Sequence, residues 1–118
     1  VGKTIWVQNQ EWMQAITAVS GSGPAYFFHM MDLLKTAAMK SGIPEDIAET
    51  LSVQTAIGSS QLALNSADDL LTLKKKVMSP GGTTEAAFKS LDENDLDKVW
   101  NEAIEAARNR SIELGRNK

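Results

Sequence analysis

The apolar residues of this chain recur mostly at steps of three and four positions, which places them on one face of an α-helix. A first helix is predicted from Glu11, and the glycines of Ser-Gly-Ser-Gly-Pro end it. A second helix is predicted over residues 24–41, capped by Ser22 or Gly23, because proline suits a first helical turn and Gly42 suits a helix end. Its apolar stripe consists of Phe27, Met31, Leu34 and Ala38.

This second helix is apolar on more than one side. Phe28 and Met39 lie outside the main stripe, on the arc that also carries His29, Asp32 and Lys35. A helix of this kind needs neighbours on several sides, and a monomer rarely leaves such a patch exposed. The pattern therefore predicts that a second copy of the chain completes the bundle.

The same periodicity predicts four further helices. One has Pro44 at its first position and ends near Leu64. A short one opens at a capping box in residues 66–69, and two more follow Thr83 and Asn94. The last helix carries an apolar line of Leu96, Trp100, Ala103, Ala107 and Leu114. The fold class is therefore an all-α bundle of about six helices.

The first seven residues, Val-Gly-Lys-Thr-Ile-Trp-Val, have the alternating, β-branched pattern of one short strand. One strand alone forms no sheet. We therefore expect residues 1–9 to be the terminal strand and linker of a neighbouring β-containing domain, and residues 10–118 to be the helical domain.

The composition fits one globular domain of 118 residues, 42% hydrophobic and 23% charged. No apolar run approaches the ~20 residues that span a bilayer, so no membrane partner is expected. A net charge of -3 provides no basic field for phosphate backbones, which argues against nucleic acid. With no cysteine and one histidine, disulfides and Cys or His metal clusters are excluded, and a cytoplasmic location is expected.

The segment Ser-Pro-Gly-Gly-Thr-Thr, residues 79–84, has two interpretations. Its glycines let a ligand approach the backbone, and the amides of the helix start that follows suit a carboxylate or phosphate. Alternatively, the hydroxyl of Thr83 or Thr84 caps the helix and nothing binds. The segment is not a nucleotide-binding P-loop, because no Gly-Lys-Ser/Thr follows. Spacing leaves both interpretations open.

The segment Ser-Gly-Ser-Gly-Pro, residues 20–24, is either a tight turn against a flat ligand or a simple break between helices. It lacks the strand and third glycine of a dinucleotide fingerprint. His29 is interpreted as solvated or at an interface, Arg110 as part of a structural ion pair, and residues 74–76 as a solvated lysine face. No catalytic triad, carboxylate pair or metal cluster is predicted.

Five segments, taken in order, carry a resemblance to a known family. They are TAVSGSGPAYFF from Thr17, SGIPEDIA from Ser41, QTAIGS from Gln54, VMSPGGTTEAAFKSLDE from Val77 and RNRSIELG from Arg108. Together they resemble the C-terminal half of the pyrroline-5-carboxylate reductase family over nearly the whole chain. SGSGPAY and SPGGTT in combination are the most specific motifs.

The resemblance implies an oxidoreductase of proline biosynthesis that reduces 1-pyrroline-5-carboxylate to L-proline with NADPH or NADH. It implies that a Rossmann domain, absent from this chain, holds the coenzyme, and that residues 1–7 are its last strand. The helical part is then a dimerisation domain that interlocks with a second copy, and some family members build rings of dimers. The chain by itself is expected to be inactive.

The resemblance also implies a site. The substrate carboxylate is expected on backbone amides around Gly81, Gly82 and Thr83, with help from Ser79. The hydroxyl of Thr84 is expected to reach the ring nitrogen as the catalytic group. The wall near the nicotinamide is expected to consist of Ser20, Gly21, Ser22, Gly23 and Pro24.

Two departures from the family pattern leave the motifs intact. Met78 stands where a small residue is common, and Asp32 stands where glutamate is common. The alternative function, from a different class, is a non-catalytic helical module that dimerises or binds a small anion.

Overall fold

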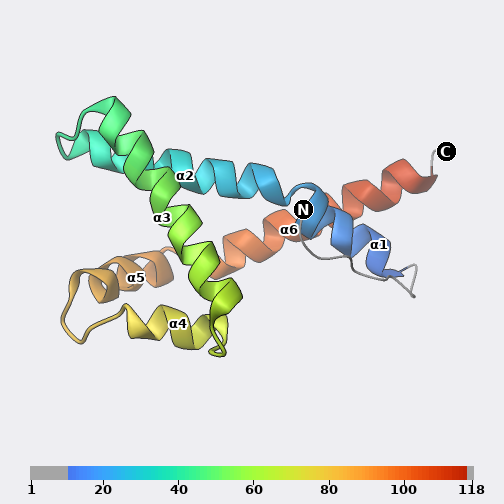
Figure 1. Ribbon diagram of the computed structural model, residues 1–118. Helices are drawn as coiled ribbons and strands as arrows, with labels where there is room; N and C mark the ends of the chain where they lie inside the picture. The colour runs from blue at the N-terminus through green and yellow to red at the C-terminus, as the bar shows by residue number, and fades with distance from the viewer. Residues whose placement is uncertain (1–10, 117–118) are drawn as a thin grey trace. The chain divides into compact units, whose positions relative to one another are not determined.

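The computed structural model describes residues 11–116 and is all-α over that range, which confirms the predicted fold class (Figure 1). Six α-helices and one π-helical turn are present there, where the sequence predicts about six helices. The strand predicted for residues 1–7 and the boundary between residues 9 and 10 lie outside the described range. The elements are α1 (Glu11–Ile16), η1 (Thr17–Gly21), α2 (Gly23–Lys40), α3 (Glu45–Asn65), α4 (Leu70–Lys76), α5 (Thr83–Glu93) and α6 (Leu96–Arg116).

The chain divides into two compact units, and each is described by itself. The terminal unit contains residues 11–26 and 95–116, and so holds α1, η1, the first turn of α2 and α6. The central unit, Phe27–Asn94, holds the rest of α2 together with α3, α4 and α5. The helix α2 therefore belongs to both units.

The terminal unit has a small core around the π-helical turn. Helix α6 packs against η1 and α1, and Ala18 of η1 is only 1% exposed. The ring of Tyr26 meets the ring of Trp100 edge-on, with centroids 5.2 Å apart and an angle of 73° between the planes. Edge-to-face aromatic pairs of this kind contribute more than their buried area alone.

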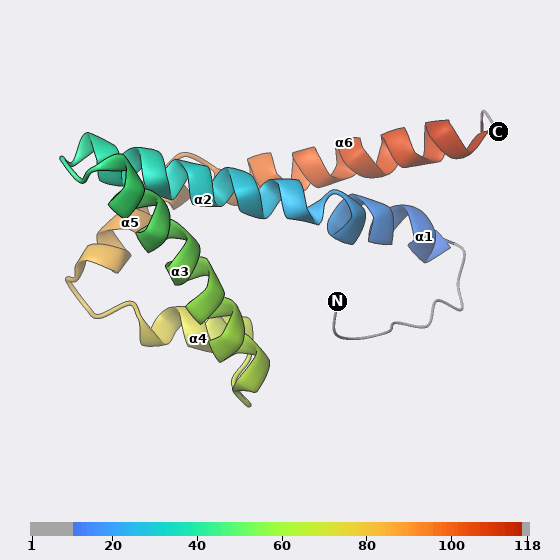
Figure 2. The same ribbon diagram turned by 45° about the horizontal axis from the view of Figure 1, so that its top comes forward.

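The central unit is built on the hairpin of α2 and α3 (Figure 2). Gly42 has a φ of +95°, and the amide of Ile43 donates to the carbonyl of Ala38 at 3.1 Å. This left-handed cap ends α2 where the sequence places its end. Pro44 lies at the N-cap of α3, one position earlier than predicted, and Glu45 is the first helical residue.

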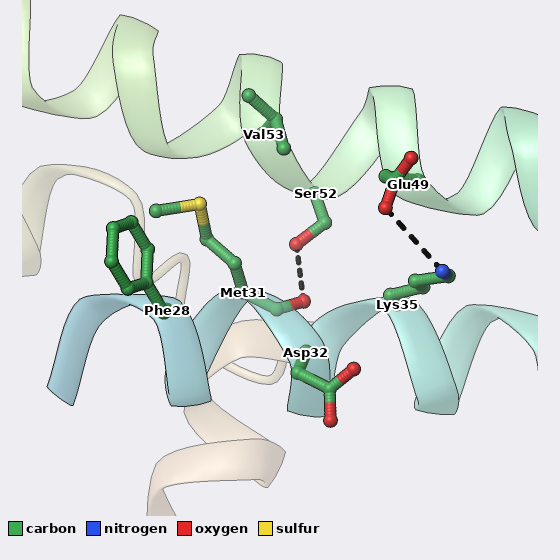
Figure 3. A pocket seen from close by; sticks show the side chains of 7 residues that line it. All are labelled: Phe28, Met31, Asp32, Lys35, Glu49, Ser52 and Val53. Carbon is green, nitrogen blue, oxygen red and sulfur yellow. Dashed lines mark hydrogen bonds and ion pairs between the residues drawn. The ribbon is translucent and has the colours of Figure 1, made fainter. Parts of the chain in front are cut away.

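Small side chains let α2 and α3 approach each other closely. Ala48 is fully buried and Ser52 is 4% exposed. The Ser52 hydroxyl donates to the backbone carbonyl of Met31 on the facing helix (Figure 3). This bond satisfies a buried hydroxyl and fixes the register of the hairpin.

The start of α4 corrects the predicted capping box. The N-cap is Asp69, whose carboxylate accepts the amide of Thr72 at 2.8 Å. Ser66 instead accepts the amide of Asp68 at 3.1 Å, which closes a turn before the helix. The carboxylate of Asp69 reaches the third residue beyond it, the usual N-cap geometry, so the helix starts at Leu70 rather than earlier.

Few apolar side chains are buried within the described residues. Ala18 and Ala48 are the buried apolar residues there, whereas the exposed fractions of Phe27 and Phe28 are 65% and 67%. Further exposed apolar residues on α2 and α3 include Met30, Leu33, Leu34, Met39, Ile47, Leu51 and Leu62. The sequence prediction of a helix that is apolar on several sides therefore holds, and these faces have no cover within their own unit.

Candidate functional site

The turn at residues 79–84 is tight because of its two glycines. Gly81 has a φ of +71°, a conformation that side chains disfavour. The amide of Gly82 donates to the carbonyl of Ser79 at 2.9 Å. A Cβ added to Gly82 would lie 3.0 Å from that carbonyl oxygen, so this close approach also requires glycine.

The start of α5 leaves several backbone amides without an acceptor. Gly82 is the N-cap, has no side chain and makes no capping bond. Within residues 11–116 nothing accepts the amides of Thr83, Thr84 and Glu85, which follow the N-cap. Such amides, at the positive end of the helix dipole, attract an anion.

The capping interpretation of this turn is therefore wrong in its detail. Neither Thr83 nor Thr84 caps the helix, because the helix begins at Thr83 and both residues lie inside it. Thr83 and Ser79 are exposed and Thr84 is half-buried. The turn thus presents amides and hydroxyls, the groups that can hold a small carboxylate.

One acidic side chain already occupies part of the turn. The carboxylate of Glu85 accepts the amide of Gly81 at 3.2 Å. Glu85 does not belong to the predicted site. Its position in the first turn of the helix is a signal for dipole stabilisation, and that signal gave no reason to expect a bond back to Gly81.

The second turn, residues 20–24, is not a loop. Residues 17–21 form a π-helical turn in which the amide of Ser22 donates to the carbonyl of Thr17 at 3.0 Å. Helix α2 then begins at Gly23, one residue before Pro24. The predicted break is therefore a widened helical turn, a feature that often lies at functional sites.

Tyr26 is a residue that the sequence analysis missed. Its hydroxyl donates to the carbonyl of Ala18 in the π-helical turn at 3.1 Å. The available signal was its place as the one tyrosine of the chain, two residues after the Gly-Pro pair. Helical periodicity does not reveal a side-chain bond that spans eight residues.

The predicted site residues fall into different units. Ser20, Gly21, Ser22, Gly23 and Pro24 lie in the terminal unit, whereas Ser79, Gly81, Gly82, Thr83 and Thr84 lie in the central unit. Within each unit the predicted residues are neighbours along one turn. The expectation that residues of both turns serve one site stays a prediction.

A separate open cavity of about 230 Å³ lies between α2 and α3 (Figure 3). Lys35 donates there to Glu45 at 3.2 Å and to Glu49 at 3.4 Å. The hydrogen bond to Glu45, assisted by Glu49, raises the pKa of Lys35, so this ammonium stays charged. The lining residues are Phe28, Met31, Asp32, Lys35, Glu49, Ser52 and Val53.

The polar residues that were predicted to have no catalytic role lie at the surface of their units. His29 is exposed. Arg110 pairs with Glu113 at 2.9 Å, which confirms the predicted ion pair, and both side chains of the pair are exposed. Two of the three lysines have partners: Lys76 pairs with Asp68, and the Lys74 ammonium lies 4.1 Å from the centroid of the Phe88 ring.

Two further findings concern residues 11–116. They contain no cluster of three or more acidic, histidine or cysteine side chains placed to hold a metal ion. No helix in this range combines the length and the apolar character that crossing a membrane requires.

These features define a class: an all-α domain with little core of its own, broad exposed apolar helix faces, and a helix on a glycine turn whose first amides have no acceptor within residues 11–116. Comparison with known proteins identifies the family. The model for pyrroline-5-carboxylate reductase dimerisation matches residues 10–114. The chain belongs to this pyrroline-5-carboxylate reductase dimerisation family, as its motifs indicate.

Individual proteins that are similar to this chain point to the same family. The pyrroline-5-carboxylate reductase of Pseudomonas aeruginosa is 44% identical over 114 residues, which cover 97% of this chain and 42% of that protein. The structure of the reductase from Coxiella burnetii matches with a TM-score of 0.91 and 42% identity, over 97% of this chain and 42% of that one. The Plasmodium falciparum enzyme with NADP bound matches with a TM-score of 0.86 and 33% identity, over 91% of this chain and 41% of that one.

The chain thus spans about two fifths of the length of the relatives it matches.

Proposed function

We propose that this chain forms the dimerisation and substrate-holding domain of a pyrroline-5-carboxylate reductase, which reduces 1-pyrroline-5-carboxylate to L-proline with NADPH or NADH. The observation that carries the proposal is the start of α5. Its amides lack acceptors in the described structure and follow a glycine turn, in a chain that belongs to this family.

The substrate carboxylate binds at the 79–84 turn in this proposal. It accepts hydrogen bonds from amides around Gly81, Gly82 and Thr83 and from the hydroxyl of Ser79. The helix dipole adds a favourable field for the negative charge. Binding one end of a small ring in this way fixes the direction in which the other end points, so the reaction gains from orientation.

Thr84 provides the catalytic contact. Its side chain lies on the first turn of α5, next to the proposed carboxylate site, and is half-buried. We assign its hydroxyl to the ring nitrogen of the substrate, which orients the C=N bond. The imine arrives protonated, so the site requires no acidic side chain to deliver that proton.

The coenzyme is assigned to a separate domain. The residues that the structure describes contain no strand followed by a glycine loop and helix, the unit that holds a dinucleotide. This part of the chain therefore does not fit the whole coenzyme. When bound, the coenzyme supplies the hydride, and the 20–24 turn walls the space beside the reacting ring.

The partner in this proposal is a second copy of the chain. The large exposed apolar side chains of α2 and α3, with Phe27 and Phe28 about two-thirds exposed, form the surface that a partner covers. A ring of several dimers is a further arrangement for the complete enzyme. A non-catalytic dimerising module is the second candidate, favoured by these same faces, which need a partner whether or not catalysis occurs.

The test uses a joined subunit, in which the part of the Pseudomonas aeruginosa reductase that this chain does not match is fused to this chain. We expect it to oxidise NADPH or NADH when 1-pyrroline-5-carboxylate is added. Thr84→Ala should lower kcat/KM by about 1 to 3 kcal/mol of transition-state stabilisation, because a hydrogen bond to the substrate is lost.

Ser90→Ala is the matched control, because it removes an exposed hydroxyl farther along α5. It should leave the kinetics unchanged. A joined subunit that dimerises but has no reductase activity would favour the non-catalytic candidate. Normal kinetics in Thr84→Ala would remove Thr84 from the site.

A further inference from the structure

The π-helical turn leaves one buried carbonyl without its usual donor. In an α-helix the carbonyl of Ala18 accepts the amide of Ser22, four residues on. Here that amide donates to Thr17 instead, at 3.0 Å. The Ser22 amide therefore does not serve the carbonyl of Ala18, a residue that is only 1% exposed. An unsatisfied carbonyl at such a position is costly.

Tyr26 supplies the missing donor. Its hydroxyl lies 3.1 Å from the Ala18 carbonyl oxygen, and its side chain is half-buried. Trp100 of α6 meets the phenol ring edge-on at a centroid distance of 5.2 Å. The ring is therefore held by an aromatic contact while its hydroxyl holds the turn.

This arrangement sets a competition between two helical geometries. Without the hydroxyl, the Ala18 carbonyl is free to take back the amide of Ser22, which converts the π-helical turn to an α-helical one. That change shifts the helical register of the turn by one residue. The residues near the turn are then rotated about the helix axis by about 100°, the angle of one residue in an α-helix. The side of the helix on which Ser20 and Ser22 project then changes.

We propose that Tyr26 is the positioning residue of the 20–24 turn: its hydroxyl holds the Ala18 carbonyl, selects the π-helical geometry and so places this turn for the reaction. The inference rests on the proposed function, in which the 20–24 turn walls the space beside the reacting ring. Tyr26 itself touches neither substrate nor coenzyme in this scheme and acts through the backbone.

The test is Tyr26→Phe in the joined subunit. Phenylalanine keeps the ring against Trp100 and removes only the hydroxyl. We expect kcat to fall by about three- to tenfold, the loss that one hydrogen bond accounts for. The KM for 1-pyrroline-5-carboxylate should stay within about twofold, since the carboxylate is held by the other turn. The acceptor of the Ser22 amide, identified by the NMR coupling across its hydrogen bond, should change from the Thr17 carbonyl to the Ala18 carbonyl.

Thr17→Val is the matched control. The Thr17 hydroxyl donates to the carbonyl of Met13 at 2.9 Å. This variant therefore removes a hydroxyl from the same turn but keeps the hydrogen bond from Tyr26 to the Ala18 carbonyl. It should match the wild type in kcat and in the acceptor of the Ser22 amide. An equal effect of both variants would overturn the inference, because it would reflect a general loosening of the turn.

Other outcomes are also decisive. If the Ser22 amide keeps the Thr17 carbonyl as its acceptor in Tyr26→Phe, the proposed selection of the π-helical geometry is overturned. Unchanged kcat in an active subunit would overturn the proposed effect on the reaction. A rise in KM with constant kcat would assign Tyr26 to substrate binding and would also overturn its role as a positioning residue. An inactive wild-type joined subunit would instead overturn the proposed function, and with it the proposed effect of Tyr26 on the reaction. This failure is seen in the wild type itself, so it is distinct from any effect of Tyr26→Phe.

Discussion

The carboxylate of Glu85 accepts the backbone amide of Gly81 at 3.2 Å, within the turn where we propose that a substrate carboxylate binds. Glu85 also lies in the first turn of α5, where its charge favours the helix dipole. An incoming carboxylate therefore competes with Glu85 for one amide and meets its negative charge. In the proposed function the substrate carboxylate displaces that of Glu85 from the Gly81 amide.

Glu85→Gln should therefore strengthen the binding of small carboxylates. We expect the Kd of the joined subunit for proline to fall by about two- to fivefold at low salt, the size of an exposed charge interaction. Calorimetry at low and high salt measures this, and the gain should shrink as salt screens the charge. Glu93→Gln, at the other end of α5, is the control. Equal affinities of wild type and Glu85→Gln at low salt would contradict the competition.

The two glycines of the same turn should resist substitution. Gly81→Ala forces a side chain into a φ of +71° and should cost about 1 to 2 kcal/mol of stability. Gly82→Ala brings a Cβ within 3.0 Å of the Ser79 carbonyl oxygen and should weaken proline binding as well. Thermal melts and calorimetry check both changes.

Gly115→Ala serves as the control for these two variants. A Cβ at Gly115 meets nothing within 4 Å, and the residue lies in the last turn of α6. It should leave proline binding unchanged and stabilise the helix slightly, because alanine has the higher helix propensity. Wild-type stability and binding in Gly81→Ala would show that the turn tolerates another geometry.

The stability of the domain should fall in acid partly through Asp69. Hydrogen bonding with Thr72 holds the pKa of Asp69 below its usual value. A carboxyl with a depressed pKa in the folded state stabilises the fold above its unfolded pKa. That contribution is lost as the pH falls through the folded pKa. The midpoint of thermal unfolding should therefore drop between about pH 5 and pH 3.

Asp69→Asn isolates this contribution, because asparagine still caps a helix but does not titrate. Circular dichroism melts across that pH range should show a smaller drop for this variant than for the wild type. Asp92→Asn removes a carboxyl from an exposed position on α5 and should keep the wild-type slope. Parallel curves for wild type and Asp69→Asn would exclude Asp69 as a source of the acid sensitivity.

The proposed dimer should depend on the apolar face of α2. Phe27 is 65% exposed in the single chain, and Phe27→Asp places a charge on a surface that we expect a partner to cover. The dissociation constant of the dimer should rise at least about tenfold, because burying an unpaired carboxylate is costly. Sedimentation equilibrium measures the constant. Lys75→Glu, a charge change at an exposed position of α4, is the control and should leave the constant unchanged. An unchanged constant in Phe27→Asp would show that Phe27 lies outside the dimer interface.

The long helices were predictable because several local signals agree. The apolar spacing of α2, the glycine at position 42 and the acidic first turn of α3 all favour the boundaries that the structure shows, within one or two residues. The short cap before α4 was less predictable. Ser66 and Asp69 both suit a cap, and the choice between them depends on which side chain reaches a free amide.

The site was predictable in its motifs but not in its detailed geometry. The glycines at positions 81 and 82 indicate a tight turn, yet the Glu85 bond to Gly81 spans four residues and competes with solvent. The π-helical turn escapes periodicity altogether, because one extra residue beside two glycines does not disturb the apolar spacing enough to be seen. The Tyr26 hydroxyl becomes visible only once the carbonyl of Ala18 is known to lack its amide.

Ala18 and Ala48 are the only buried apolar residues in the described range. This scarcity affects how such a chain folds and assembles. If two copies share one interior, folding and assembly are a single event whose rate depends on how often two chains meet. Dilution then unfolds the protein, and a defective copy disables the sound copy that it captures. A destabilising variant would therefore act dominantly in cells that make both forms.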